Sequence, residues 1–258
     1  AGLNSPLGTN STINIGTSVG SFNFLVWSNT VAETTDKTIN LAGTVGGALI
    51  ANKGSALLKF TAPVTATGVG AKTFYPDQDD VNGVTEFAGS IPDSSSGAIT
   101  IKKGGAGKLV LSAANTFTGG VRFNGGTLEL GNPSALAAGN YLKYESQASG
   151  TALVKVAYAA AGPDLGNLEV DVNGTLDLGT DNTAQIRFAT ATGWTAGTTL
   201  TITNSTGGGK LYILDSTGLV STQIVSAENS TYPASIATDG LVTFTAPAPV
   251  GSTFTSWL

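Results

Sequence analysis

Apolar and polar residues alternate most clearly in three short stretches between Gly104 and Asn140. Each stretch places two large apolar residues two positions apart, a spacing that is typical of strands with one buried side. Runs rich in Asn and Gly separate the stretches, and these residues turn a chain easily because they tolerate positive φ. Three short strands with sharp corners predict one coil of a solenoid. We expect six side chains to point into its core: Leu109, Leu111, Val121, Phe123, Leu128 and Leu130.

Further strand-like segments occur on both sides of this region. They are Thr12–Ile15, Phe22–Trp27, Thr38–Leu41, Ala56–Phe60, Leu142–Tyr144 and Leu153–Val156. A small helical piece is expected around Ser221–Ile224. The predicted fold class is all-β: a short parallel β-solenoid (β-helix) with an irregular N-terminal β region and a C-terminal capping segment.

The corners of the central coil carry a recognisable motif. Gly105–Leu111 reads Gly-x-Gly-x-Leu-x-Leu, Asn115–Gly120 reads Asn-Thr-Phe-Thr-Gly-Gly, and Asn124–Gly131 reads Asn-Gly-Gly-Thr-Leu-x-Leu-Gly. This run resembles the autotransporter-associated β-strand repeat, also called the passenger-associated transport repeat, of secreted bacterial surface proteins. The resemblance implies a solenoid in an extracellular protein, and it covers about a seventh of the chain.

A weaker copy of the last motif follows downstream. Asn173–Gly179 echoes Asn124–Gly131, and Thr175 lies 48 residues after Thr127. This separation predicts two coils of about 20 to 29 residues each. The segment from Trp194 to Phe244 resembles the one that often follows the last repeat in the family, and we expect it to cap the solenoid.

The rhythm of strands breaks between residues 62 and 97. Three prolines, an acidic run and a Ser-rich run indicate loops or a small insertion here. We therefore divide the chain into an N-terminal β region (1–97), a solenoid (98–245) with its marker repeat at 104–140, and an extended tail (246–258).

The composition removes several classes of function. The chain has no Cys, no Met and no His, which excludes thiol nucleophiles, His-based triads and the usual zinc sites. The formal net charge is -5 and no basic cluster exceeds Lys102-Lys103, so nucleic acid and anionic membrane are poor partners. No apolar run approaches the roughly 18 to 20 residues that span a bilayer. We predict no cofactor and no membrane span.

The start of the sequence and the lack of Cys also bear on location. The chain begins with Ala1-Gly2 rather than Met, and we expect that a leader was removed. An extracellular or cell-surface protein without disulfides needs another source of stability, which the stacked coils of a solenoid supply.

Two groups of carboxylates are the remaining candidates for chemistry. Glu169, Asp171 and Asp177 lie on expected strands, where residues two apart are separated by about 6.6 Å, within the range of inverting glycosidases. The same alternation also places polar residues on any solvent-facing side, and we favour that interpretation. The acidic loop Asp77–Gly83 resembles a calcium loop but misses its spacing by one residue, so a solvated turn is favoured over cation binding. We predict no catalytic, cofactor or metal residues and no enzyme.

The favoured function is a structural subunit that polymerises. No charged residue occurs from Ala1 to Val26, so nothing there keeps a strand edge from pairing with another molecule. We expect a head-to-tail filament formed by strand addition at the solenoid ends. The candidate interface residues are Ile13, Ile15, Phe22, Phe24, Trp27, Phe254 and Trp257. The alternatives are a monomeric passenger or adhesin module, with surface glycans or other surface proteins as partners, and a carbohydrate-binding or carbohydrate-active β-helix.

Overall fold

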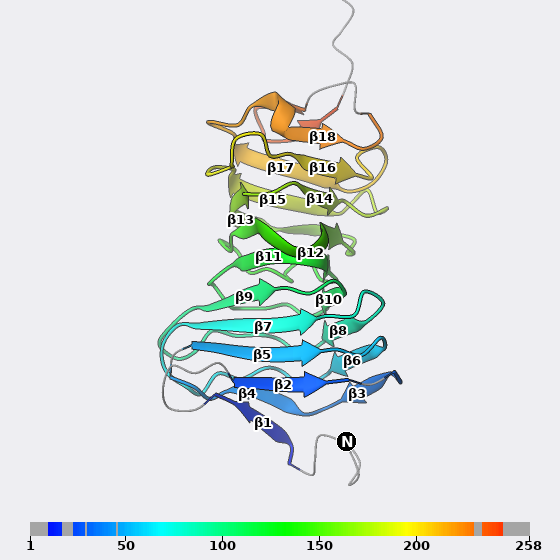
Figure 1. The fold of residues 1–258 in the computed structure, drawn as a ribbon. Helices are drawn as coiled ribbons and strands as arrows, with labels where there is room; N and C mark the ends of the chain where they lie inside the picture. The colour runs from blue at the N-terminus through cyan, green and yellow to red at the C-terminus, as the bar shows by residue number, and fades with distance from the viewer. Residues whose placement is uncertain (1–9, 17–22, 29, 45, 230–233, 245–258) are drawn as a thin grey trace, which may run out of the picture.

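The computed structural model of the chain is a stack of short strands that rises coil by coil (Figure 1). The structure describes residues 10–16, 23–28, 30–44, 46–229 and 234–244. Within these ranges there is no α-helix, and the one helical element is a 3-10 turn at Ser221–Gln223, where the sequence predicted a helical piece. None of the described segments forms a helix that is long and apolar enough to span a membrane.

The strands form three parallel ladders along the stack. Ladder 1 contains β2 (Asn23–Trp27), β5 (Gly46–Asn52), β7 (Lys72–Gln78), β9 (Ile99–Lys103), the first parts of β11 (Val121–Leu130) and β12 (Leu142–Val156), and the last part of β13 (Ala161–Val170). Ladder 2 contains β3 (Glu33–Thr35), β6 (Leu57–Phe60), β8 (Val84–Phe87), β10 (Lys108–Leu111), the last parts of β11 and β12, β14 (Gly174–Asp177), β16 (Leu200–Thr203) and β18 (Ile224–Ser226). Ladder 3 has two parts, β1 (Thr12–Ile15) with β4 (Thr38–Leu41), and the first part of β13 with β15 (Gln185–Thr190) and β17 (Lys210–Asp215). The predicted parallel β-solenoid is therefore confirmed.

The spacing of the coils agrees with the repeat seen in the sequence. Thr127 lies beside Leu153, and Leu153 lies beside Thr175. The two copies of the Asn-Gly motif are thus two coils apart, as predicted. Coil length varies from 19 residues, between the paired Lys108 and Thr127, to 27 residues, between the paired Lys72 and Ile99.

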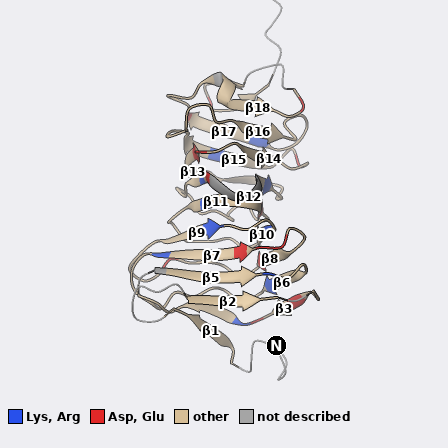
Figure 2. Cartoon of the chain, viewed as in Figure 1, with Lys and Arg blue, Asp and Glu red and all other residues tan. Residues whose placement is uncertain are grey.

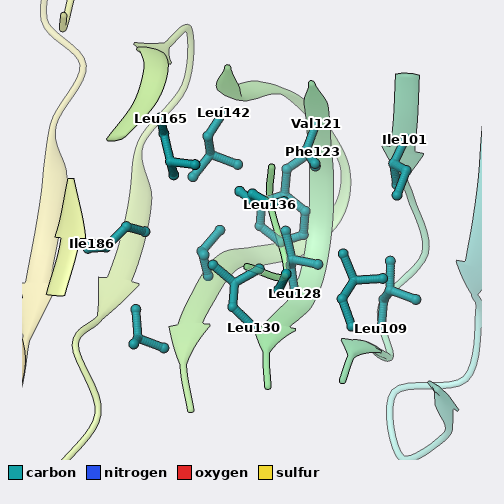
Figure 3. Packing of buried hydrophobic residues seen from close by; sticks show 14 of the residues in the cluster. Ile101, Leu109, Val121, Phe123, Leu128, Leu130, Leu136, Leu142, Leu165 and Ile186 are labelled. Carbon is teal, nitrogen blue, oxygen red and sulfur yellow. The ribbon is translucent and has the colours of Figure 1, made fainter. Parts of the chain in front are cut away.

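The core is a set of columns of apolar side chains along the axis. In ladder 2, Phe60, Phe87, Leu111, Leu130 and Val156 follow one another in register, and all are buried. The rings of Phe60 and Phe87 stack with their centroids 5.1 Å apart. Figure 3 shows side chains of this kind converging between the strands of the central coils. The six inward side chains predicted from the sequence are all buried: Leu109, Leu111, Val121, Phe123, Leu128 and Leu130.

Residues 62–97 are more regular than the sequence indicated. Strands β7 and β8 lie in this segment and pair with β9 and β10 as in any other coil. The ladders thus run through Gly97 without a break, and a separate N-terminal domain stays a prediction.

Pro76 explains why a strand was not expected here, because proline is rarely found in a central strand. The backbone N of Lys72 bonds toward β9, so by alternation Pro76 also faces that side. The pairing of β7 with β9 ends at Phe74, and the missing N–H of Pro76 therefore interrupts no ladder.

The two ends of the stack differ. At the C-terminal end, β19 (Ser235–Ile236) and β20 (Val242–Thr243) form an antiparallel pair, and Leu241 bridges to Tyr212 of β17 in the antiparallel sense. This reversal closes ladder 3, although the cap begins later than expected because β16 to β18 still belong to the solenoid. At the N-terminal end, β2 and β3 each pair on one side within the described residues. The tail at 246–258 lies outside the described residues.

Candidate functional site

Asn115, in the corner motif, links three successive coils. Its side chain is buried, Oδ1 accepts a hydrogen bond from the backbone N of Ile91 at 2.8 Å, and Nδ2 donates to the backbone O of Ala135 at 2.7 Å. Asn140 contacts the preceding coil alone: its Oδ1 accepts from the backbone N of Gly120, and its Nδ2 donates to the backbone O of Phe117. The two asparagines therefore add side-chain hydrogen bonds between coils at a corner where no strand runs.

The Gly-rich corner of the repeat surrounds a buried lysine. Nζ of Lys103 donates to the backbone O of Gly105 at 3.0 Å and of Gly125 at 3.2 Å. Burial lowers the pKa of Lys103 to about 8. Position 126 requires glycine, because its φ is 71° and a Cβ there would lie 2.4 Å from the backbone O of Gly107. The Gly-x-Gly and Asn-Gly-Gly motifs therefore allow the coils to approach closely around one ammonium group.

The carboxylates of the acidic loop have separate partners. Asp77 accepts a hydrogen bond from the backbone N of Gly104 at 2.6 Å, and burial raises its pKa. Asp79 forms an ion pair with Lys53 at 2.9 Å, and Asp80 accepts a bond from the backbone N of Asn82 at 2.9 Å. Within the described ranges no group of three or more acidic side chains is arranged to hold a metal ion.

The carboxylate pair on β13 and the following turn is bridged by a lysine. Nζ of Lys143 lies 2.5 Å from Glu169 and 2.9 Å from Asp171. The third candidate, Asp177, accepts bonds from the backbone N of Gly179 at 2.9 Å and from Nδ2 of Asn204 at 2.6 Å. Glu169 and Asp171 are therefore ion-paired with one lysine, and Asp177 is held separately by hydrogen bonds.

The proposed assembly residues fall into three groups. Ile15 and Trp27 are buried, and Ile13 is partly buried against the core of the same chain. Phe24 is 67% exposed on the outer side of β2, beside Val26 at 47%. The others, Phe22, Phe254 and Trp257, lie outside the described residues. An assembly role for this set stays a prediction.

Figure 2 shows that β1, β2 and β5 carry no charged residue, whereas β7 begins with Lys72 and ends close to Asp77. The uncharged character of the N-terminal sequence thus extends across the first strands of ladder 1.

The sequence interpretation missed two structural roles. The sequence pattern indicates Asn115 only as a turn residue, and it gives Lys103 no particular role. Lys103 follows Ile99 and Ile101 at intervals of two residues, so it lies on the same buried side of β9. This alternation could have predicted a buried lysine from the sequence.

These features define the chain as a parallel β-solenoid whose motif residues serve contacts between coils. Residues 96–130 match the passenger-associated-transport-repeat family, so the chain contains the repeat that its motifs indicated. The family implies a secreted or cell-surface location.

One curated protein with similarity to the chain is the adhesin BmaC autotransporter of Brucella suis biovar 1 (strain 1330). It is 30% identical over 102 residues, which are 39% of this chain and 3% of the relative. The chain therefore covers only a small part of the length of that adhesin. No solved structure matches the chain.

Proposed function

We propose that the chain is a non-catalytic section of a bacterial surface passenger that supports and presents an adhesive surface outside the cell. One observation carries the proposal: ladder 2 continues without interruption from β3 to β18. Such a stack extends along one axis, because each coil contacts only its neighbours. It acts as a rigid spacer with a long lateral surface.

The bridged carboxylates support a role without catalysis. An inverting glycosidase leaves room for a water molecule between its two carboxyl groups. Glu169 and Asp171 instead both contact the ammonium group of Lys143. The arrangement suits a solvated outer face.

Adhesion is inferred from the Brucella adhesin, which shares similarity with 39% of this chain. The test is binding of the fluorescently labelled chain to epithelial cell layers and to matrix-coated surfaces. We expect saturable binding above that of a non-adhesive protein of similar size and charge. Binding equal to that control on every surface would contradict the adhesive role.

Self-association into a filament is a second candidate, supported by open strand edges. Within the described residues β3 pairs with β6 alone, and β18 pairs with β16 alone. These are the first and last strands of ladder 2, so β3 of one copy can continue the ladder after β18 of another. A contact of that kind joins different surfaces and extends without closing.

The geometry of β3 offers a specific test of the filament. The backbone O of Thr35 accepts a bond from Thr61 of the next coil, so the backbone groups of Thr34 point away from β6. Thr34→Pro removes one outward donor and no bond within the chain, whereas Thr34→Ser keeps the donor. We expect the wild type and the Ser variant to lengthen with concentration in sedimentation velocity and electron microscopy, and the Pro variant to stay shorter. A wild type that remains monomeric across the concentration series rejects the filament.

A further inference from the structure

An apolar pocket lies at the C-terminal end of the stack, beside β18 (Figure 1). It has a volume of about 160 Å³ and is lined by Ser216, Leu219, Val220, Ile224, Ala234 and Ile236. All of these side chains except that of Ser216 are apolar, and Val220 is 61% exposed. A cavity of about 150 Å³ with an aliphatic lining accommodates a benzene ring. The pocket therefore has the size and the lining to hold one aromatic ring.

The chain leaves the described part of the structure beside this pocket. Strands β19 and β20 are antiparallel, with Ser235 opposite Thr243. The next position in the same register places Phe244 opposite Ala234, which lines the pocket. Nδ2 of Asn229 also donates to the backbone O of Phe244 at 3.4 Å. Because neighbouring strands lie about 4.7 to 4.9 Å apart, the tail (246–258) starts close to the rim of the pocket.

The tail has a suitable composition and length to cover the pocket. It contains no charged residue, and its aromatic residues are Phe254 and Trp257. Trp257 lies 13 residues beyond Phe244, and 13 residues extend to at most about 43 to 47 Å. This length is ample for a return to a pocket that lies beside Phe244.

We propose that the tail folds back onto its own chain and that Trp257 fills the pocket. A buried indole N–H usually has a hydrogen-bond partner, and Oγ of Ser216 can accept such a bond at the pocket. The ring of Phe254 has no polar group to use this acceptor, so Trp257 suits the lining better. The docked tail covers Val220 and lies next to Ile224, the first residue of β18. It thereby closes an apolar surface at the C-terminal end of the stack.

The tail of the same chain is a better occupant than a segment of a second copy. A segment tethered close to its site has an effective concentration on the order of millimolar. A second copy reaches that concentration only in a very concentrated solution. The inference is separate from adhesion and from the filament, because it concerns a contact within one chain.

Fluorine NMR of the full chain with 5-fluorotryptophan tests the docking. The chain has three tryptophans, and the resonance that is lost in Trp257→Phe belongs to Trp257. A soluble gadolinium chelate broadens the resonances of exposed rings. We expect the Trp257 resonance to broaden less than that of a free peptide of residues 246–258. This protection should be the same at every protein concentration of a dilution series.

Val220→Asp places a charge at the pocket, and we expect the Trp257 resonance then to broaden as strongly as that of the free peptide. The turn tolerates the change, because Val220 is the N-cap of the 3-10 turn and Asp is favoured at an N-cap. The matched control is Val81→Asp, at a turn residue that is 70% exposed, and Trp257 should stay protected in it. Unchanged resonances of Trp27 and Trp194 show that the fold is intact.

Three results would overturn the proposal. The first is a Trp257 resonance in the wild type that broadens as strongly as that of the free peptide, which means that the tail does not dock. The second is protection that disappears on dilution, which assigns the tail to a second copy. The third is protection that survives in Val220→Asp, which places Trp257 on another surface.

Discussion

Oδ1 of Asn115 accepts a hydrogen bond of 2.8 Å from the backbone N of Ile91, in the preceding coil. The same side chain reaches the following coil through Nδ2. Asn115→Ala leaves a buried N–H and a buried C=O without partners, and each such group costs about 1 to 3 kcal/mol. We expect the free energy of unfolding to fall by about 2 to 4 kcal/mol in chemical denaturation. Asn82→Ala, in an exposed turn, is the control, and an equal effect of both changes would contradict the bridging role.

Phe87 tests the aromatic column of the core. It stacks on Phe60, and Phe74 meets its ring edge-on at 5.4 Å. Phe87→Ala creates a cavity between two coils, and we expect the free energy of unfolding to fall by about 3 to 5 kcal/mol. Val81→Ala changes a side chain that is 70% exposed and should alter the free energy of unfolding by less than about 0.5 kcal/mol. A loss below about 1 kcal/mol for Phe87→Ala would mean that the stack is not closely packed.

Because Lys103 is buried, we expect the free energy of unfolding to rise in mildly alkaline solution. Its pKa is about 8 in the folded chain, against 10.5 for an unperturbed lysine. Between these values the unfolded chain binds more protons than the folded chain, so the free energy of unfolding increases with pH. The full effect is about 3 kcal/mol. The melting temperature of Lys103→Met should lack this rise between pH 8 and 10, whereas Lys53→Met, at an exposed ion pair, should keep it. The same pH profile in wild type and Lys103→Met would disprove the assignment.

Chelation tests the acidic loop. Asp79 and Asp80 have partners within the chain, so stability should not depend on a bound cation. We expect the melting temperature to be the same with EDTA, with added calcium and with neither. A ligand that binds the folded state raises stability by mass action, and a shift of several degrees on adding calcium would therefore identify the loop as a cation site.

Polysaccharide hydrolysis tests the carboxylates of β13. We expect neither the wild type nor Asp171→Asn to release reducing sugar from a panel of polysaccharides, because both candidate carboxylates form ion pairs with Lys143. Release by the wild type that Asp171→Asn abolishes would establish a catalytic site.

The sequence predicts the fold well where local spacing and global packing agree. Leu128 and Leu130 alternate with polar residues, and the structure buries both. The match between Thr127 and Thr175 gives the coil length because both positions belong to one ladder. Pro76 marks a place where prediction from the sequence fails. Proline is rare in central strands, so the sequence did not predict β7. The proline is tolerated because the pairing of β7 with β9 ends at Phe74. Where that pairing ends depends on two coils, and the sequence of one strand does not reveal it.

The bridging role of Asn115 was beyond sequence reasoning for a similar reason. Its partners, Ile91 and Ala135, belong to the preceding and the following coil. No spacing along the chain places these two residues beside Asn115, because their positions depend on how three coils stack.

The parallel ladders also determine how the molecule responds to tension. The ladder bonds, such as those between β10 and β11, run along the stacking axis. Each coil contributes about 4.8 Å to the height of the stack, yet its residues extend to roughly 65 to 90 Å once detached. A pull along the axis therefore unzips coils singly from one end, and each released coil lengthens the molecule by more than ten times its own height. An attachment made through such a stack yields in small steps under flow instead of breaking at one peak of force.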